Sequence, residues 1–484
     1  MVSKRLLGVL LTACCGCVWT SAGGELCARA EAGMRKAGVH WARKVASHGG
    51  FVWEYSTDFV TRRRGESGDL PLSTVWVQAG APMVGEVFLR VYEVTNDAVF
   101  LEAAVAAARC LAWGQLASGG WTYSIEFDLT RNRHRYHHLS AEQAKGLRNT
   151  TTFDDNNTQS ATRFLMHVDE HVDDVEVTAA IDRALACFLA AQYGEGAWDG
   201  AWPQRYPPPK KGYGAYPTYN DNTMSDCVKT VLHAYRQYGK AEYLASVKRC
   251  LAFYLRSQQP DPQGVWAQQY DRDLKPAWAR RFEPPSVTGA ESCGNARLLM
   301  DMFLEFGDPQ YLAAVGRAVD WYRRSRIGGS ETSGRWARFY ELGTNRPLYF
   351  TRTYKLVYTD DDLPVHYSFR SHYGVDDMIK RYEALRKKGR EAQIRARERR
   401  RSQAEWRERM AGLIPKVEAI LAAQDDLGRW VKVVPQRNLK RDKDGRISYE
   451  ENTKKPLPMI YSRTLVRNMR LLADYAEASR ASAE

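Results

Sequence analysis

The stretch CLAWGQLASGGW at residues 110–121 carries the pattern that decides the fold: an apolar helix that ends near a glutamine, then a glycine-rich turn and a tryptophan. The layout returns as CFLAAQYGEGAWDGAW at 187–202 and as CLAFYLRSQQPDPQGVW at 250–266. Looser copies are WYRRSRIGGSETSGRW at 321–336 and AILAAQDDLGRW at 419–430. A fixed short period indicates a solenoid, whereas these intervals are irregular and long enough for two helices and a loop. The sequence therefore predicts a repeat of helix pairs.

The helix pairs are visible as apolar residues at helical spacing, interrupted by a few polar residues. The predicted pairs are 84–94 with 99–111, 158–168 with 177–189, 224–238 with 243–255, and 290–306 with 311–322. Short polar connections are typical of antiparallel helix hairpins. We therefore expect an all-α fold, an (α/α) toroid or barrel of helix hairpins with long loops that form a cleft. An open helical array is the alternative, which the large irregular loops disfavour.

The first residues have the features of an export signal. Lys4 and Arg5 precede a short apolar run at 6–13, far below the ~20 residues that cross a bilayer. The run ends in Leu-Thr-Ala-Cys, which resembles a bacterial lipobox with Cys14 as the lipidated residue. Ordinary cleavage near Ser21 is the alternative. We expect a secreted or cell-envelope protein of a bacterium, periplasmic or an outer membrane lipoprotein, that meets a membrane only through such a lipid.

The expected domain organisation is simple. A signal peptide covers 1–22, and a single toroid domain covers 23–484. Within that domain, residues 381–410 are rich in arginine and lysine. We expect them to form a long solvated helix inserted before the last repeat, with contact to a polyanion or a membrane surface as the alternative.

Composition narrows the classes of partner. With 44% hydrophobic and 26% charged residues, the 484-residue chain is neither disordered, collagen-like nor a coiled coil. Its formal net charge of +13 favours a polyanionic partner: nucleic acid, an anionic membrane or an acidic polysaccharide. The export signal and carboxylate-rich loops oppose nucleic acid. The six cysteines beyond the signal contain no CxxC, which disfavours a zinc site and favours buried thiols, with one disulfide left open.

Polar runs stand at the start of several predicted helices, at 152–158, 219–223 and 286–291. An N-cap side chain accounts for one polar position at a helix start. It does not account for several in a row. The inner helices of a toroid all begin at the same end of the ring. These polar runs are therefore expected to meet around one functional cleft.

At these residues the sequence resembles the pectate lyases of polysaccharide lyase family 10, the pectic acid lyases. The resembling segments are collinear: GGW at 119–121, TTFDDNNTQSATRFL at 151–165, AWPQRYP at 201–207, TYNDNTM at 218–224, WARRFEPPSVTGAES at 278–292 and RWARFYELGTNRPLYFTR at 335–352. The resemblance implies an (α/α) toroid and calcium-dependent cleavage of polygalacturonate (pectin) by β-elimination, and the export signal adds that this lyase is exported. We expect a monomer.

The resemblance also implies roles for individual residues. Asp154 matches the acidic residue that meets calcium and substrate, and Asp221 matches the second acidic residue of the cleft. Both are expected metal ligands, with Ca²⁺ as the cofactor. Arg280 matches the catalytic arginine, and its neighbour Arg281 is the alternative by one position.

Four further residues are expected to bind the substrate. Arg352 and Arg370 match arginines that hold substrate carboxylates, although the family pattern around Arg370 is only partly present. Asn220 and Trp121 are expected to contact the sugar.

These residue types suit the expected chemistry. Elimination removes the C5 proton beside a uronate carboxylate and expels the 4-O-linked sugar. Calcium takes oxygen ligands, and arginine pairs with carboxylates bidentately. Arginine as the base follows from the resemblance alone, since its pKa is ordinarily above about 12 and only burial or neighbouring cations favour neutral guanidine. The chain departs from the family at Asn156 and Asn157, where small residues are usual.

Two other functions remain open at this point. A glycoside hydrolase on the same kind of toroid would use two carboxylates that flank the bond, drawn from Asp154, Asp221 and Glu291. A non-catalytic pectin-binding lipoprotein would keep the aromatic residues and tolerate the loss of Arg280.

Overall fold

The computed structural model describes residues 22–64, 69–330, 333–364, 367–441 and 447–483. The expected signal peptide, with Cys14, lies outside these residues. Among the described helices, none combines the length and the apolar character that crossing a bilayer requires.

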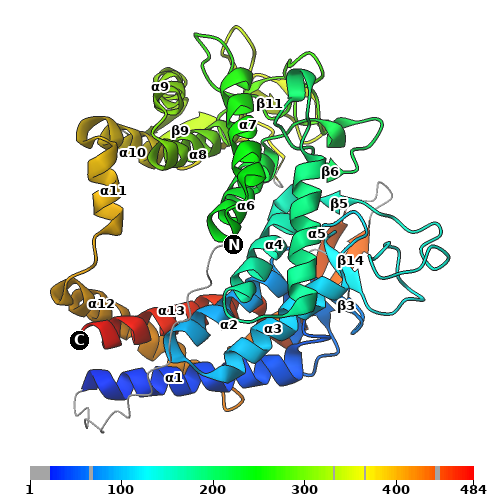
Figure 1. Cartoon of the computed structure of the whole chain (residues 1–484), viewed down its shortest axis with the longest axis vertical. Helices are drawn as coiled ribbons and strands as arrows, with labels where there is room; N and C mark the ends of the chain where they lie inside the picture. The colour runs from blue at the N-terminus through cyan, green and yellow to red at the C-terminus, as the bar shows by residue number, and fades with distance from the viewer. Residues whose placement is uncertain (1–21, 65–68, 331–332, 365–366, 442–446, 484) are drawn as a thin grey trace.

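The four predicted helix hairpins are confirmed, and the fold is an (α/α) toroid (Figure 1). Each hairpin places its first helix against the next hairpin's first helix, so the first helices form the inner wall of a ring. The four pairs are α2 (Ala81–Thr95) with α3 (Ala98–Trp113), α4 (Asn157–Asp169) with α5 (Val175–Ala191), α6 (Thr223–Tyr238) with α7 (Ala241–Ser257), and α8 (Glu291–Phe306) with α9 (Pro309–Arg324).

The two ends of the chain build one further pair of the ring. α1 (Ala22–His40) packs along α13 (Ser462–Ala481), and α13 also packs against α2. Figure 1 shows the first and last helices side by side. Helices more than 400 residues apart in sequence therefore complete the toroid.

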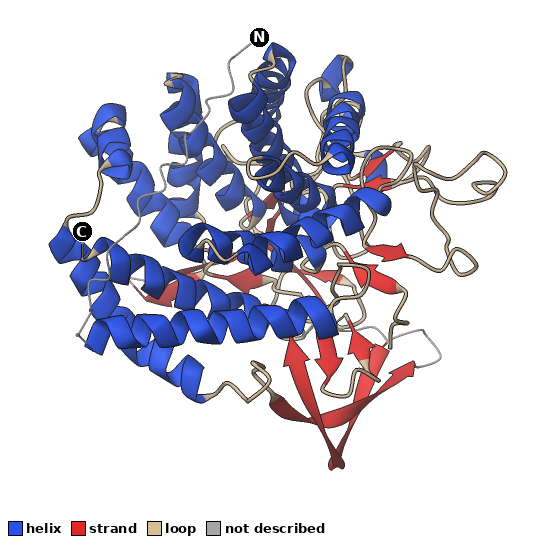
Figure 2. Cartoon of the chain, turned by 60° about the horizontal axis from the view of Figure 1, so that its bottom comes forward, coloured by secondary structure: helices blue, strands red, loops and turns tan. Residues whose placement is uncertain are grey.

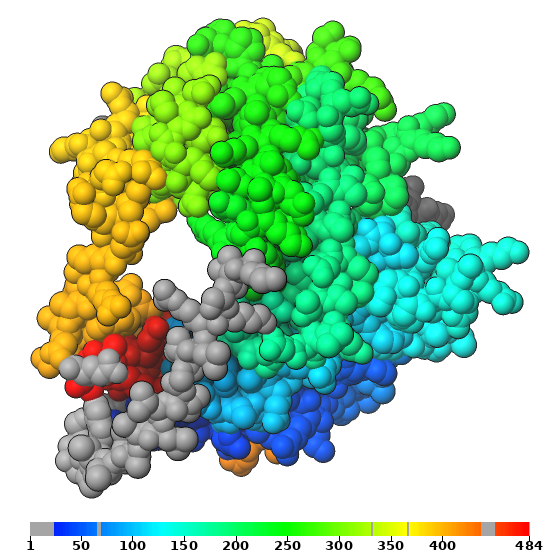
Figure 3. Space-filling view, in the orientation of Figure 1, coloured from blue at the N-terminus to red at the C-terminus, as the bar shows by residue number. Residues whose placement is uncertain are grey.

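The prediction of one long helix over 381–410 is wrong. The chain instead forms α10 (Val375–Lys388), α11 (Arg390–Glu398) and α12 (Gln403–Ala422). Gly389 ends α10 with φ of 77°, a conformation that glycine adopts without a steric cost. Ser402 starts α12 through a capping box with Glu405. In Figure 3 an opening passes through the ring, between the orange segment that contains α11 and the green helices.

The repeated glutamine joins neighbouring helices of the outer wall. Gln192 Nε2 donates to the carbonyl oxygens of Gly200 (2.8 Å) and of Ser246 in α7 (2.9 Å). Gln115, Gln258 and Gln424 make the same two kinds of bond, and Gln424 reaches Gly33 in α1. A buried amide that satisfies two carbonyl groups explains why glutamine recurs after α3, α5, α7 and α12, whereas α9 is followed by Ser325.

The repeated tryptophan seals the same helix ends. Each indole Nε1 donates to a carbonyl in the last turns of the preceding outer helix, at 2.8–2.9 Å, for Trp121, Trp202, Trp266, Trp336 and Trp430. These five indoles are buried. The six cysteines of the described residues are buried too and form no disulfide, as the sequence favoured.

Short antiparallel strands in the loops gather on one side of the ring (Figure 2). One sheet has the order β14-β15-β1-β2 and contains a long hairpin that the sequence analysis did not predict. A second, β12-β11-β10-β7, and a third, β13-β9-β8, hold the loops near α8. Two strand pairs, β3-β4 and β5-β6, complete the set.

The strands have the following bounds: β1 Glu54–Ser56, β2 Arg62–Arg63, β3 Thr74–Trp76, β4 Ser124–Glu126, β5 Thr151–Thr152, β6 Arg205–Tyr206, β7 Val287–Thr288, β8 Gly328–Ser330, β9 Ser333–Ala337, β10 Phe339–Tyr340, β11 Pro347–Phe350, β12 Leu356–Val357, β13 Arg370–Ser371, β14 Lys432–Arg441 and β15 Ile447–Tyr461.

Candidate active site

The inner helices α4 and α6 begin with the same unusual turn. A 3₁₀ turn at Asp154–Asn156 precedes α4, and one at Asn220–Asn222 precedes α6. The second residue of each turn is left-handed, with φ of 53° at Asp155 and 47° at Asp221, and so is the residue that follows it. Aspartate and asparagine tolerate this conformation better than other residues with a side chain. The shared turn places Asp155 and Asp221 at equivalent positions of neighbouring helices.

Three carboxylates meet at these turns. Asp154, Asp155 and Asp221 each offer an oxygen, and these oxygens lie within 4.8 Å of one another. Tyr123 Oη donates to Asp154 Oδ2 (3.3 Å) and to Asp155 Oδ2 (3.0 Å). Asn220 donates its side-chain amide to Asp221. Within the described residues, Asp154 Oδ1 and Asn220 Oδ1 are buried and have no hydrogen-bond partner.

The electrostatics of this acidic cluster favour a bound cation. Partial burial, followed by the charges of Asp154 and Asp155, raises the pKa of Asp221 to about 6. Burial and Asp155 also raise the pKa of Asp154. Crowded carboxylates with unpartnered oxygens provide the ligands that a hard cation such as Ca²⁺ takes.

A buried ion pair adjoins the cluster at the start of α8. Arg338 Nη2 donates to Glu291 Oε1, and both side chains are largely buried. Glu291 Oε2 is buried and has no partner in the described part of the chain. The guanidinium of Arg338 lies 4.2 Å from the centre of the Tyr367 ring. The charges of Glu291 and Arg338 both act on Asp221, so the pair lies beside the acidic cluster.

Arg280 is held by a second buried carboxylate. Its Nε and Nη2 donate to the two oxygens of Glu283 at 2.8 and 2.5 Å, and Glu283 is 1% exposed. Tyr367 Oη donates to the same carboxylate at 3.1 Å. The hydrogen bond to Glu283 raises the pKa of Arg280. Although burial acts the other way, the Arg280 bonds lower the pKa of Glu283.

The two adjacent arginines have different surroundings. Arg280 is coupled electrostatically to Asp221, and its guanidinium also lies 5.5 Å from the centre of the Tyr367 ring. Arg281 is exposed and lies over the ring of Tyr354, 3.8 Å from its centre. Arg280 is therefore the arginine that faces the acidic cluster.

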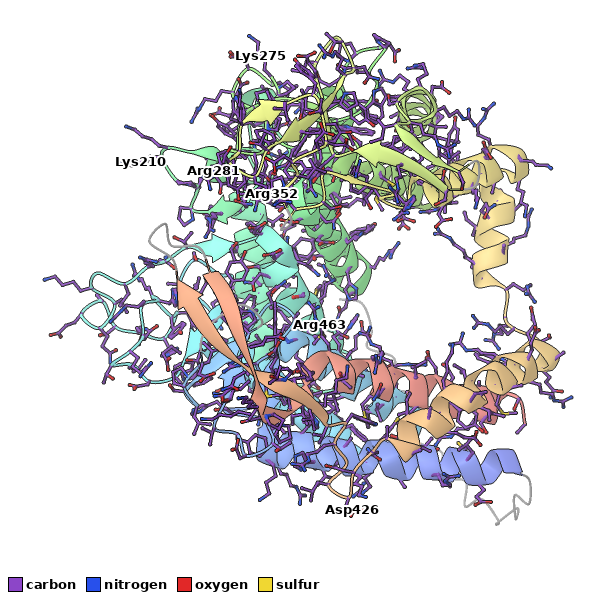
Figure 4. All side chains as sticks on the ribbon, turned by 180° about the vertical axis from the view of Figure 1, so that it is seen from behind. Lys210, Lys275, Arg281, Arg352, Asp426 and Arg463 are labelled. Carbon is purple, nitrogen blue, oxygen red and sulfur yellow. The ribbon has the colours of Figure 1, made fainter. Side chains whose placement is uncertain are left out.

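The expected substrate arginines lie on the loops next to α8. Arg352, labelled with Arg281 in Figure 4, is exposed and its Nε lies 3.2 Å from Asp362 Oδ1. Arg370 lies in β13, which pairs with β9, and it forms an ion pair with Asp360. Both arginines keep a large exposed fraction, so their charges are accessible to a polyanion.

The prediction that Trp121 binds the substrate is wrong. Its side chain is fully buried, and its indole Nε1 donates to Leu111 O at 2.8 Å. The indole seals a helix end, as the other repeated tryptophans do. An exposed aromatic side chain near Arg280 is Trp278, at 48% exposure.

Some residues of the site were missed by sequence reasoning. Asp155 could have been found, because Asp155-Asn156 repeats the Asp221-Asn222 of the next inner helix. The contacts of Tyr123, Glu283 and Arg338 depend on loop packing, and no local pattern in the sequence indicates them.

Comparison with known families decides the assignment. The sequence model of the family described as pectic acid lyase matches residues 115–374, which is more than half of the chain. The chain belongs to the pectic acid lyase family. Every residue of the acidic cluster and both ion pairs of this pectic acid lyase lie within the matched range. Membership makes the chain a polysaccharide lyase that acts on pectate.

Solved structures similar to this pectic acid lyase include a family 10 polysaccharide lyase from Cellvibrio cellulosa, at 22% identity and a TM-score of 0.47, covering 62% of this chain and 96% of that one. A variant of that lyase in complex with trigalacturonic acid has 22% identity and a TM-score of 0.46, covering 62% and 98%. An α-1,6-mannanase from Salegentibacter sp. has 10% identity and a TM-score of 0.41, covering 94% and 99%. No curated protein sequence matches the chain.

Proposed function

We propose that this pectic acid lyase is an exported enzyme that cleaves polygalacturonate by calcium-dependent β-elimination. The observation that carries the proposal is the juxtaposition of the acidic cluster with the arginines of the Glu283 and Glu291 ion pairs. Carboxylates that attract a cation then lie beside guanidinium groups that attract uronate carboxylates. A neutral polysaccharide would need neither set.

Asp154, Asp155 and Asp221 would hold the calcium ion, together with the carbonyl oxygen of the Asn220 side chain. Calcium bound there would neutralise the uronate carboxylate and make the C5 proton more acidic. Tyr123 orients Asp154 and Asp155 through its hydroxyl group. The unpartnered oxygens of Asp154 and Asn220 support this assignment.

Arg280 is proposed as the base that removes the C5 proton. Glu283 fixes the guanidinium plane through two parallel bonds, which leaves the Nη1 edge for the substrate. Because the same carboxylate raises the pKa of Arg280, proton removal requires alkaline pH or a weaker Glu283 contact in the substrate complex. The electron pair of the C5–H bond then forms the C4–C5 double bond, and the O4-linked sugar leaves.

Arg352 and Arg370 are proposed to bind carboxylates of neighbouring sugar residues. Their present partners are loop residues: Asp362 is exposed, and Asp360 is partly exposed. Exposed ion pairs contribute little free energy, so a substrate carboxylate can replace either aspartate at small cost.

We further propose that the chain is exported through a signal over 1–22, with Cys14 as a lipid site, and that 23–484 form one monomeric toroid domain. The closure of the ring by α1 and α13 supports a single domain, since the two chain ends are part of one structure.

The experiment that tests the proposed reaction is product analysis after incubation with polygalacturonate. Elimination gives a new chain end with a C4–C5 double bond, which NMR detects directly. Hydrolysis gives a saturated end instead and would favour a glycoside hydrolase. The absence of any new chain ends would favour a pectin-binding protein.

A further inference from the structure

A cavity of about 450 Å³ adjoins the acidic cluster between the inner helices α2, α4 and α13. It shares Asp155 and Asn156 with the candidate active site. A second cavity, of about 310 Å³, continues from it along the same helices and shares Glu86, His167 and Arg470 with it. The space beside the acidic cluster is therefore large enough for a sugar residue, and it reaches the turn that precedes α4.

Two arginines of this cavity lack a carboxylate partner in the part of the chain that the structure describes. His167 Nδ1 lies 3.0 Å from both oxygens of Glu86, and this bond raises the pKa of His167. Asp155 belongs to the acidic cluster. Arg163 and Arg470 also line the cavity, and neither forms an ion pair with a carboxylate of the described residues. The lining thus carries two arginines without an ion pair beside one carboxylate, Asp155, which the proposed calcium ion would neutralise.

Arg163 is partly buried, and its hydrogen bonds within the described residues go to neutral groups. Its Nη2 donates to Asn156 Oδ1 (2.7 Å), and its Nη1 donates to Thr230 Oγ1 (2.5 Å) and to Asp226 O (3.4 Å). A guanidinium has five N–H donors, so donors remain for a ligand. Burial lowers the pKa of Arg163, and the charges of Asp226 and Glu86 only partly oppose this shift because neither carboxylate contacts the guanidinium. An anion bound in the cavity would add a direct partner for this cation.

The other walls suit a sugar residue. Pro82 and Met83 give the cavity an apolar side against which the C–H face of a pyranose can pack, and Gln78 and Ser160 add hydrogen-bonding groups. Arg470 approaches from α13, is exposed, and has no ion-pair partner to lose among the described residues. The combination of two guanidinium groups and an apolar wall matches a uronic acid.

We propose that this cavity is a subsite for a galacturonate residue, whose carboxylate binds between Arg163 and Arg470 while its C–H face packs on Pro82 and Met83. The subsite rests on the proposed function for the identity of the polymer. It extends the proposed substrate-binding site from the acidic cluster along α2, α4 and α13. Arg470 and the α2 residues lie outside the residues that match the family, so the toroid beyond that match contributes to substrate binding.

The test is the binding of trigalacturonate by calorimetry, in chelator so that no cleavage occurs, to the wild type and to Arg470→Gln. Because Arg470 is exposed and without an ion pair, the variant is expected to fold, which its thermal melting curve checks. Loss of one charge-assisted contact is expected to weaken binding about tenfold. Arg467→Gln removes an equal charge from an exposed position of α13 outside the cavity lining and is expected to bind as the wild type does.

Kinetics separate this subsite from the proposed reaction. With oligogalacturonates of increasing length, Arg470→Gln is expected to raise KM for the longer substrates about tenfold and to leave kcat unchanged. If the wild type forms no unsaturated product and Arg470→Gln still weakens trigalacturonate binding, the proposed reaction fails and the subsite stands. Equal affinity of the wild type, Arg470→Gln and Arg467→Gln, or no measurable binding by any of them, overturns the subsite.

Discussion

At the scale of single residues, the site is organised by which charges are paired. Arg280 is held by Glu283 and faces the acidic cluster, whereas Arg281 lies over the partly buried ring of Tyr354. The two bonds to Glu283 fix the plane of the Arg280 guanidinium group. The ammonium group of a lysine has no such plane and cannot be held in the same way.

Arg280→Lys is therefore expected to lower kcat on the order of 100-fold or more, because the base and its bidentate contact are both lost. KM should change far less. Arg281 makes no carboxylate contact of this kind among the described residues, so Arg281→Lys is the matched control. This variant is expected to lower kcat only slightly. Steady-state kinetics on polygalacturonate measure both. The reverse order of effects would move the catalytic role to Arg281.

The calcium requirement is expected to depend on pH through Asp221. Its pKa of about 6 is raised above the ordinary value, so protons compete with calcium for this carboxylate as the pH falls through 6. The calcium concentration for half-maximal activity should rise as the pH is lowered from 7 to 5. Asp221→Asn should raise that concentration at every pH and flatten the dependence, as should Asp155→Asn. An unchanged calcium requirement in both variants would remove these residues from the metal site.

The residues of the candidate site could be predicted only where a sequence pattern repeats. The turns before α4 and α6 were predicted from their runs of polar residues to line a functional cleft. Trp121 was misassigned because a tryptophan that closes a helix end and one that stacks on a sugar have the same sequence context. Glu283 and Arg338 find their partners through tertiary packing, which no local spacing reveals.

At the scale of elements, the glutamine that follows α3, α5, α7 and α12 joins each of these outer helices to the next one. Gln192 has 7% exposure and bonds to carbonyl oxygens of two different segments. Its own side-chain oxygen accepts from Ser246 Oγ at 2.8 Å. The neighbouring hairpins are joined through this one side chain.

Gln192→Leu should consequently destabilise the fold by about 2–4 kcal/mol, because buried carbonyl groups lose their donors. Urea unfolding curves measure the change. Gln310→Leu, at an exposed position of α9, is the control and should be near neutral. A loss below about 0.5 kcal/mol for Gln192→Leu would show that the amide is not the link between the hairpins.

Helix hairpins were predictable because apolar residues at helical spacing need only local sequence. The β14-β15 hairpin was not. Its strands include Pro435, Pro456 and Pro458 and several charged residues, which weaken any strand pattern. Its place in the fold depends on pairing with β1, about 400 residues away in sequence.

At the scale of the whole molecule, the ring is closed by the two ends of the chain. α1 covers α13, and Gln424 joins the last outer helix to Gly33. Long-range pairing of this kind has no signal in a single sequence, so the sequence analysis found four helix pairs and missed the closure.

A chain that begins at Ala46, without α1, should therefore fail to fold cooperatively, since the buried face of α13 loses its cover. The matched control begins at Ala22 and should melt as the full chain does. Size-exclusion chromatography and thermal melting distinguish them. A monodisperse product from Ala46 with an unchanged melting temperature would contradict the assignment of α1 to the ring.

The most direct test of calcium-dependent elimination is the near-ultraviolet absorbance of unsaturated product formed from polygalacturonate, followed in added calcium and in excess chelator. The account predicts a steady rise in absorbance with calcium, no rise with chelator, and recovery when calcium is restored. An equal rate in chelator, or new chain ends without any absorbance, would contradict it.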